Sequence, residues 1–338
     1  METVFSGIQP SGELHLGNYL GAIRNWVALQ EQHRCIFCIV DYHAITAPYD
    51  AVTMRRRTLD MAANLLACGI DPARATLFVQ SHVPEHTELA WVLSAVTPMG
   101  ELSRMTQFKE KSQQQARGRG THPSAGTEAD HVNVGLFGYP VLQAADILLY
   151  KATRVPVGKD QIQHLELARE IARRFNARFG ETLPEPQPLL SSTPKIMGLD
   201  GQAKMSKSLG NTIGLLEEPD AARAKLRTAF TDPQRLRRSD PGRPEVCNVF
   251  TMHGFFSDEA RLAEIDAGCR TASLGCVDCK KLLADGMLAR LEPIRERARA
   301  LRADETRVAE VLREGAERCR VIARETMREV REKLGLLG

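Results

Sequence analysis

The first stretch with residues suited to chemistry runs from residue 6 to residue 21 and reads Ser-Gly-Ile-Gln-Pro-Ser-Gly-Glu-Leu-His-Leu-Gly-Asn-Tyr-Leu-Gly. Its glycines let a ligand approach the backbone, and the free N–H groups at the start of the helical pattern that follows favour phosphate. His15 and Asn18 add polar groups there. The stretch predicts a phosphate-binding loop. A well-capped turn is the alternative, because short glycine-rich motifs also occur by chance.

A second polar cluster lies at residues 204–211, Lys-Met-Ser-Lys-Ser-Leu-Gly-Asn, after a proline-rich segment at residues 184–194. Two flexible ammonium groups and two hydroxyls within five residues suit a polyphosphate. Glycines on both sides indicate a loop. Two distant stretches of the chain therefore favour phosphate.

A carboxylate stands in an apolar setting at Asp146. Residues 139–150 are apolar on nearly every side except at Gln143 and Asp146, which predicts a buried helix. A buried carboxylate needs a hydrogen-bond donor. The donor is either a structural partner such as an arginine or an N–H group of a bound ligand.

Four cysteines form the fourth signal: Cys247, Cys269, Cys276 and Cys279 end in a C-x-x-C pair. Four thiols in this arrangement suggest a metal site, and by spacing alone zinc fits as well as an iron-sulfur cluster. Plain thiols are the third alternative. By contrast, Cys35 and Cys38 lie three apart on a predicted strand, so they point to opposite faces and we expect them to pack in the core.

The composition is that of a globular protein: 338 residues, 43% hydrophobic and 26% charged, with a net charge of +3. These values allow two domains and exclude disordered and collagen-like classes, while the net charge is too small to diagnose nucleic-acid binding. We expect a cytoplasmic protein without a membrane or DNA partner, because no secretory signal or membrane-spanning apolar run is found. In that reducing compartment the eight cysteines are thiols or metal ligands.

The elements that must hold these groups alternate between strands and helices. Apolar runs at residues 4–5, 35–40, 75–80 and 155–157 read as strands, and helical patterns cover residues 14–26, 51–68, 100–111, 139–150 and 161–175. This alternation predicts an α/β fold with a Rossmann-type parallel sheet, which binds ligands at the carboxyl ends of its strands. Residues 7–18 and 41–43 fall at such ends. Residues 112–131 have few apolar side chains and are predicted to form a mobile surface loop.

From about Pro219 onward the strand signals disappear, and Ala, Leu, Arg and Glu recur at helical spacing. We predict a catalytic domain at residues 1–214 and an all-helical domain at residues 215–338. The second domain is rich in arginine: Arg290, Arg295, Arg297, Arg299, Arg313, Arg318, Arg320 and Arg324. With glutamates interspersed, such a pattern indicates a surface of ion pairs more often than an RNA-binding face.

The loops at residues 10–18 and 204–208 together resemble the HIGH and KMSKS signatures of class I aminoacyl-tRNA synthetases. Residues 7–12, 41–46, 105–111 and 144–148 narrow this resemblance to the bacterial tryptophanyl-tRNA synthetases, over nearly the whole chain. The sequence departs from the family in three places. Asn18 replaces the last histidine of HIGH and the first is absent, Gln143 stands where many members carry Met, and residues 112–131 are longer than usual.

The resemblance implies a homodimer that converts L-tryptophan and ATP, with Mg²⁺, into tryptophanyl-adenylate and pyrophosphate. The tryptophanyl group then passes to the 3′-terminal ribose of tRNA(Trp), bound through the anticodon by the helical domain. In-line attack on the α-phosphate needs positioning and charge stabilisation rather than a covalent enzyme nucleophile.

The resemblance also assigns residues to this reaction. The catalytic set is His15, Asn18, Lys111, Lys204 and Lys207. The ATP-binding set is Gln9, Pro10, Ser11, Gly17, Asn18, Gly158, Lys159, Asp160, Gln161, Ile196, Lys204, Met205, Ser206, Lys207 and Ser208. The tryptophan-binding set is Phe5, Gly7, His43, Tyr139, Gln143, Asp146, Ile147, Val155, Val157 and Gln161, in which Asp146 accepts the indole N–H.

The four cysteines resemble those of a subset of the family that holds a 4Fe-4S cluster beside the anticodon-binding surface, with a first gap one residue longer in that subset. Zinc remains the less favoured alternative. Three other functions stay open at this point: a tyrosyl-tRNA synthetase, a catalytically inactive synthetase-like RNA-binding protein, and a small-molecule adenylyltransferase. The intact Lys204 and Lys207 argue against the inactive protein, and the arginine-rich helical region argues against the adenylyltransferase.

Overall fold

The computed structural model describes residues 2–109, 133–158, 161–190 and 196–337. Five parallel strands form its sheet in the order β3-β2-β1-β4-β5. Their bounds are β1 Thr3–Ile8, β2 Arg34–Ile39, β3 Ala75–Val79, β4 Arg154–Val157 and β5 Gln187–Leu190. The predicted parallel α/β sheet is therefore confirmed.

The fifth strand is the one that the sequence did not predict. β5 lies at the sheet edge beside β4 and contains Pro188, which pairs with Val155. Proline lacks an N–H group and is tolerated in a sheet mainly at such edges. For this reason the proline-rich segment does not look like a strand in the sequence.

Two hydrophobic cores lie on the two faces of the sheet. Cys35 and Phe37 of β2 belong to one core, together with α4 (Ala51–Ala67), and Ile36 and Cys38 belong to the other, with α8 (Val134–Leu148) and α9 (Ile162–Phe179). α4 matches its predicted bounds to one residue, whereas α8 begins before the predicted start at residue 139 and α9 continues past the predicted end at residue 175. The two cysteines point to opposite faces, as predicted from the alternation of side chains along a strand.

The predicted helix at residues 14–26 is built from three pieces. α1 (Leu16–Asn18) is followed by a π-helical turn at Tyr19–Ile23 and then by α2 (Arg24–Leu29). π-helical turns occur frequently at functional sites. This one directly follows the first candidate loop.

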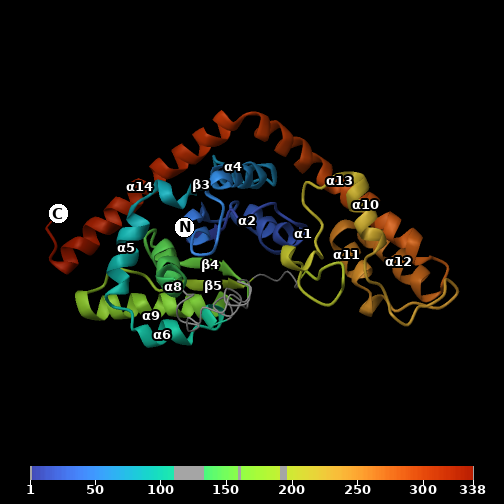
Figure 1. Cartoon of the computed structure of the whole chain (residues 1–338), viewed down its shortest axis with the longest axis horizontal. Coiled ribbons are helices and arrows are strands. Elements are labelled where there is room, and N and C mark those ends of the chain that lie inside the picture. The colour runs from blue at the N-terminus through green and yellow to red at the C-terminus, as the bar shows by residue number, and fades with distance from the viewer. Residues whose placement is uncertain (1, 110–132, 159–160, 191–195, 338) are drawn as a thin grey trace, which may run out of the picture.

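Shorter helices follow β2 and β3: α3 (Asp41–Ala44), α5 (Glu85–Ser94) and α6 (Met99–Arg104). The chain after residue 218 contains α10 (Pro219–Arg227), α11 (Asn248–Phe256), α12 (Glu259–Arg270), α13 (Cys276–Ala303) and α14 (Glu305–Leu334). Figure 1 shows α10, α11 and α12 on the side of the molecule away from the sheet. Within the described residues, no helix is both long and apolar enough to cross a membrane.

The last helix returns to the sheet (Figure 1). α14 packs against β3, and Leu312 belongs to one core while Cys319 belongs to the other. Between them lies Gly315, where a Cβ atom would collide with the backbone carbonyl oxygen of Leu77. The glycine lets α14 cross the open edge of β3 at backbone contact.

Candidate active site

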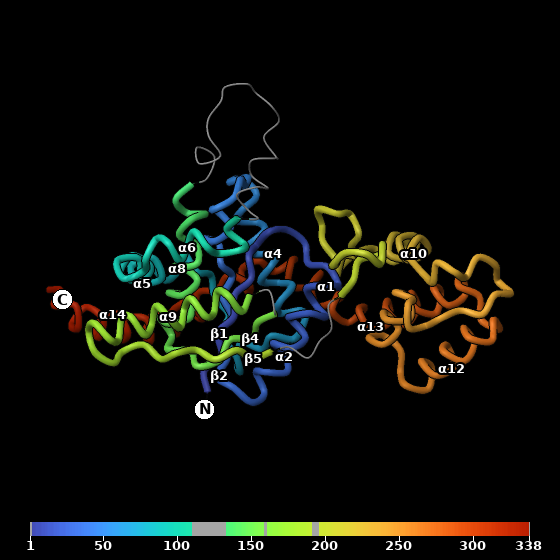
Figure 2. Tube along the Cα trace, turned by 90° about the horizontal axis from the view of Figure 1, so that it is seen from below, coloured from blue at the N-terminus to red at the C-terminus, as the bar shows by residue number. Residues whose placement is uncertain are grey.

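The two predicted phosphate loops meet in space. The loop after β1 leads into α1, and the segment around residues 196–215 lies beside it in both views (Figures 1 and 2). The backbone N–H of Leu16 donates to the carbonyl of Ile213 at 3.0 Å, and the N–H of Leu215 donates to the carbonyl of Leu14 at 2.8 Å. The first loop, residues 9–18, and the lysine loop, residues 204–211, therefore form one site.

Lys207 makes the direct link between the two loops. Its Nζ donates to the backbone oxygen of Ser11 at 3.3 Å, across 196 residues of sequence. The φ of Gly12 is +106°, and a Cβ atom there would stand 3.2 Å from Lys207 Nζ. Glycine is needed at this position both for the left-handed backbone and for the approach of the ammonium group.

The N-terminus of α1 is capped by a side chain of the same helix. The backbone N–H of His15 donates to Asn18 Oδ1 at 3.1 Å. A Cβ atom at Gly17 would lie 2.9 Å from the His15 ring and 3.1 Å from Met205 Cβ, so the glycine makes room for both loops. Met205 is buried, and its N–H donates to the carbonyl of Ile196 at 3.0 Å, which anchors the lysine loop.

His15 is held neutral in this setting. Burial, together with the nearby positive charges of Lys207 and Lys204, lowers its pKa to about 4. Its Nδ1 atom is buried and has no hydrogen-bond partner among the described residues. A neutral imidazole with an open polar atom, facing two lysines, is suited to bind a polar, anionic ligand.

Asn211 braces the lysine loop, a role that the sequence did not reveal. Its Oδ1 accepts from the N–H of Ser206 at 2.7 Å, and its Nδ2 donates to Asp200 Oδ2 at 2.9 Å. The hydroxyls of Ser206 and Ser208 lie 3.0 Å apart, and both lysine side chains are exposed. The loop thus presents two cations and two hydroxyls at its surface, and the hydrogen bonds of Asn211 hold its backbone in place.

Asp146 is the centre of a second polar cluster, inside α8. It is 2% exposed, and its oxygens accept from His43 Nε2 at 2.8 Å, Gln80 Nε2 at 2.7 Å and His86 Nδ1 at 2.6 Å. Burial raises the pKa of Asp146, but the hydrogen bonds from His43 and His86 more than offset it, so the pKa is lowered and the group is a carboxylate. Its partners are two histidines and a glutamine rather than an arginine.

Several predicted tryptophan-site residues lie on the same side of the sheet as α8, the helix that carries Asp146. Phe5, Ile147, Val155 and Val157 share one apolar core cluster, and the ring of His43 lies 6.3 Å from that of Tyr139. Tyr139 also shares a 2.9 Å hydrogen bond with His164. Strands β1 and β4 and helices α3 and α8 thus contribute to one region at the carboxyl ends of the strands.

The remaining predicted residues are placed as follows. Gly7 is the next-to-last residue of β1 and lies next to Val40. Gln143 and Gln161 are partly buried, Gly158 is exposed just after β4, and Gln9 and Pro10 lie in the first loop. Lys111, Lys159 and Asp160, and the predicted loop at residues 112–131, lie outside the described residues. Gln80, His86 and Tyr150 were not predicted. The sequence signal for Gln80 is only that it ends the strand predicted at residues 75–80, and His86 lies in the helix α5 that follows β3.

The four cysteines come from three segments of the helical region. Cys247 precedes α11, Cys269 lies in the last turn of α12, and Cys276 and Cys279 lie in the first turn of α13. Burial, together with the neighbouring thiols of the other three cysteines, raises the pKa of Cys279 to about 12. The thiols are therefore neighbours. Within the described part of the chain, however, no three His, Cys, Asp or Glu side chains are arranged to hold a metal ion.

Most of the arginines singled out in the sequence have partners within the chain. Arg295 is buried beside Glu292, Arg297 donates to the carbonyl of Ala67 at 2.8 Å, and Arg320 donates to the carbonyl of His82 at 2.9 Å. Arg299, Arg313 and Arg324 form ion pairs with glutamates. These six side chains stabilise the helical region and its contact with the sheet.

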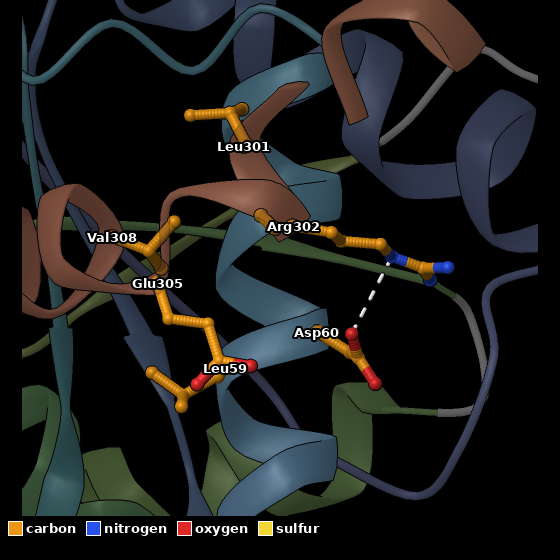
Figure 3. A pocket seen from close by; sticks show the side chains of 7 residues that line it. Leu59, Asp60, Leu301, Arg302, Glu305 and Val308 are labelled. Carbon is orange, nitrogen blue, oxygen red and sulfur yellow. Dashed lines mark ion pairs between the residues drawn. The ribbon is translucent and has the colours of Figure 1, made fainter. Parts of the chain in front are cut away.

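Away from both clusters, a small pocket lies between α4 and the corner of α13 and α14 (Figure 3). Leu59, Leu301 and Val308 line it, and the ion pair of Asp60 with Arg302, at 3.4 Å, closes one side. The pocket contains none of the predicted site residues. It reflects incomplete packing where α13 and α14 meet α4.

Comparisons with known proteins agree with this geometry. A family model described as tRNA synthetases class I (W and Y) matches residues 1–292. A tryptophan–tRNA ligase of Deinococcus radiodurans is 51% identical over 342 residues, covering 100% of this chain and 99% of that protein. One of Thermotoga maritima is 45% identical over 339 residues, with 99% of each chain covered.

Among solved structures, the tryptophanyl-tRNA synthetase of Campylobacter jejuni, complexed with ADP and tryptophan, has a TM-score of 0.87 and 37% identity. The match covers 99% of this chain and 100% of that one. A tyrosyl-tRNA synthetase of Archaeoglobus fulgidus has a TM-score of 0.64 and 21% identity, covering 88% of this chain and 90% of that one, which shows the fold alone.

The sheet, the two joined loops and the matching family model define a class I aminoacyl-tRNA synthetase. Within that class, the chain belongs to the tryptophan–tRNA ligases. It is an enzyme, an aminoacyl-tRNA ligase, so neither the inactive RNA-binding protein nor the small-molecule adenylyltransferase describes it.

Proposed function

We propose that this ligase activates tryptophan with ATP at the joined loops and then transfers the tryptophanyl group to tRNA(Trp). The observation that carries the proposal is the contact between Lys207 and the first loop, beside a neutral His15. This contact places cations next to a helix N-terminus, where phosphates bind.

In the first step, a carboxylate oxygen of tryptophan attacks the α-phosphorus of ATP. A new O–P bond forms, the bond to the β-phosphate oxygen breaks, and its electron pair leaves on pyrophosphate. Lys204 and Lys207 neutralise that charge, and Mg²⁺ arrives with ATP as part of the substrate. In the second step, a ribose hydroxyl of tRNA attacks the acyl carbon and AMP leaves.

The nucleotide is assigned to residues of both loops and to the end of β4. His15, with its open Nδ1, and the backbone around Gly17 contact the phosphates, while Gly158 and Gln161 lie toward the ribose. Lys111, Lys159 and Asp160 complete this set in the proposal. Tryptophan binds where Phe5, Ile147, Val155 and Val157 provide apolar surface, and Asp146 accepts the indole N–H, which is a donor only.

Tryptophan-dependent exchange of labelled pyrophosphate into ATP tests the proposed activation step. We expect exchange with tryptophan and none with tyrosine at equal concentration. Exchange with neither amino acid would contradict the proposal, and exchange with tyrosine alone would support the tyrosyl alternative.

The helical region, residues 215–338, is proposed to bind the anticodon of tRNA(Trp) as a separate domain. Arg237 and Arg238 are exposed in the loop after α10, on the side of the molecule away from the sheet. Exposed arginines suit contact with phosphates. Replacing both by alanine should raise the KM for tRNA in aminoacylation and leave pyrophosphate exchange unchanged. Equal loss in both assays would contradict this assignment.

We propose a homodimer, as in the family, in the cytoplasm. Three large apolar side chains are exposed on helices that pack together: Trp91 of α5 at 80%, Met99 of α6 at 73% and Val134 of α8 at 85%. A surface of this kind marks an interface. In light scattering, Trp91→Glu should shift the mass from dimer to monomer, whereas Val321→Glu, at an exposed apolar residue of α14, should not. A wild-type monomer would contradict the proposal.

The four cysteines are proposed to hold a 4Fe-4S cluster. Within the described residues no group is arranged for a metal ion, so the proposal rests on the C-x-x-C spacing in the sequence and on the nearness of the four thiols. The four thiols are neighbours, and two of them lie in the first turn of α13. When bound, the cluster would tie the ends of three helices together.

Anaerobic purification tests the cluster. The protein should be brown, with absorbance near about 400 nm, and Cys276→Ser should remove the colour. Cys68→Ser, at a buried cysteine outside the group, should keep it. A colourless wild-type protein with stoichiometric zinc, or with no metal, would contradict the proposal.

A further inference from the structure

A chain of buried polar groups connects Asp146 to the C-terminal helix. His86 Nδ1 lies 2.6 Å from Asp146 Oδ1, and His86 Nε2 lies 2.7 Å from the hydroxyl of Tyr150. Tyr150 in turn lies next to the thiol of Cys319 of α14. His86 and Cys319 are fully buried and Tyr150 is 3% exposed, so water does not compete for these bonds.

The chemistry of the groups gives the chain a direction. A carboxylate only accepts, so His86 Nδ1 carries a proton and donates it to Asp146. In the neutral imidazole Nε2 is then the acceptor, and the O–H of Tyr150 donates to it. The oxygen of Tyr150 remains free to accept from the thiol of Cys319, whose pKa burial raises to about 12. Each group therefore fixes the proton position of the next.

The same bonds leave one acceptor site on Asp146. Oδ1 accepts from both Gln80 and His86, whereas Oδ2 accepts from His43. Gln80 is oriented by the N–H of Tyr42, which donates to its Oε1 at 3.1 Å. Because the carboxylate is held by three donors from different segments, it cannot rotate freely. Oδ2, with one partner, has a lone pair left for a further donor.

We propose that His86, oriented by Tyr150 and anchored to α14 through Cys319, is a positioning residue that aims Asp146 Oδ2 at the indole N–H of tryptophan. The inference rests on the proposed role of Asp146 and adds the residues that set its orientation. It also joins the amino-acid pocket to α14, the helix that closes the edge of the sheet at β3.

The test compares tryptophan with an analogue in which sulfur replaces the indole nitrogen, so that the ring has no N–H. In wild-type enzyme, kcat/KM for pyrophosphate exchange should favour tryptophan. Tyr150→Phe keeps the ring and removes the hydroxyl. It should raise KM for tryptophan about tenfold, leave kcat within about twofold, and change the KM for the analogue less than about twofold.

Two substitutions at His86 provide a second test of the proposal. His86→Asn keeps a donor near the position of Nδ1 and should retain most of the preference for tryptophan, whereas His86→Leu has no donor and should lose it. Ile171→Val, in the same core cluster but outside the hydrogen-bond chain, is the control and should keep the preference. If Tyr150→Phe does not fold, the comparison of the two His86 variants decides.

The outcomes distinguish the positioning role of His86 from the proposed contact between Asp146 and the indole N–H. Equal losses for tryptophan and the analogue in Tyr150→Phe, or equal preference in His86→Asn and His86→Leu, would show a purely structural role and overturn the inference. If wild-type enzyme itself does not prefer tryptophan over the analogue, the proposed contact between Asp146 and the indole N–H fails instead.

Discussion

The Nζ atom of Lys207 lies 3.3 Å from the backbone oxygen of Ser11, and this contact closes the lysine loop over the start of α1. Both loops are short and polar, and neither could hold a triphosphate alone. Their contact brings two cations to a helix N-terminus whose histidine is neutral. The predictions below follow from this contact and from the elements that support it.

Lys207→Ala should lower kcat for pyrophosphate exchange about 10²–10³-fold, because a cation that stabilises charge on the leaving phosphates is lost. The KM for tryptophan should stay within about twofold, since Lys207 contacts the first loop and is not among the partners of Asp146. Steady-state exchange kinetics measure both constants. Lys333→Ala, at an exposed lysine near the end of α14, is the control. An unchanged kcat in Lys207→Ala would remove the lysine from the reaction.

Asn211→Asp should weaken catalysis because it removes a hydrogen bond that supports the lysine loop. Aspartate can still accept from the N–H of Ser206, but it repels Asp200 instead of donating to it. We expect kcat to fall about tenfold and the KM for ATP to rise. Gln202→Ala, at an exposed residue of the same segment, should have wild-type kinetics. Wild-type values in Asn211→Asp would show that the brace has no kinetic role.

His15 should make the protein less stable in mild acid. Its pKa is about 4 in the folded state, below the ordinary value of 6.5, so the unfolded chain binds the proton more tightly. The stability from neutral His15 is full above about pH 6.5 and is lost as the pH falls toward 4. Between pH 7.5 and pH 5 the free energy of unfolding should fall by on the order of 1–2 kcal/mol from this group.

Urea unfolding at the two pH values, in wild type and in His15→Gln, isolates this contribution. The variant should lose less stability on acidification than the wild type does. Equal losses would mean that His15 does not titrate below its ordinary range.

Gly315→Ala should destabilise the protein by about 2–4 kcal/mol, because the new methyl group meets the backbone carbonyl of Leu77. The matched control is Gly254→Ala in α11, where a Cβ atom meets nothing within 4 Å. That substitution should raise stability by about 0.5–1 kcal/mol through helix propensity. Thermal and urea unfolding measure both. A neutral effect of Gly315→Ala would place α14 farther from β3 than the structure does.

The sequence was sufficient for those parts of the fold that local patterns determine. Alternating apolar runs and helical spacing predicted four of the strands and the helices α4, α8 and α9. The geometry of a strand also predicted that Cys35 and Cys38 point to opposite faces of the sheet. β5 was missed, since Pro188 at a sheet edge leaves no strand pattern. The return of α14 to β3 depends on a contact between residues 77 and 315, which no local pattern contains.

The same division holds for the candidate site. Short motifs marked both phosphate loops and Asp146, because their residue types are unusual in their local setting. Asn211, Gln80 and His86 act through partners that are distant in sequence or that only the tertiary fold orients, such as Asp200 and Tyr150. Their roles became visible only with the distances between side chains.

The most direct test of the account is the exchange of labelled pyrophosphate into ATP by the purified wild-type protein, with tryptophan and with tyrosine in turn. The account predicts exchange that depends on tryptophan, followed by transfer of labelled tryptophan to tRNA(Trp). Absence of exchange with tryptophan in folded protein, or exchange only with tyrosine, would contradict it.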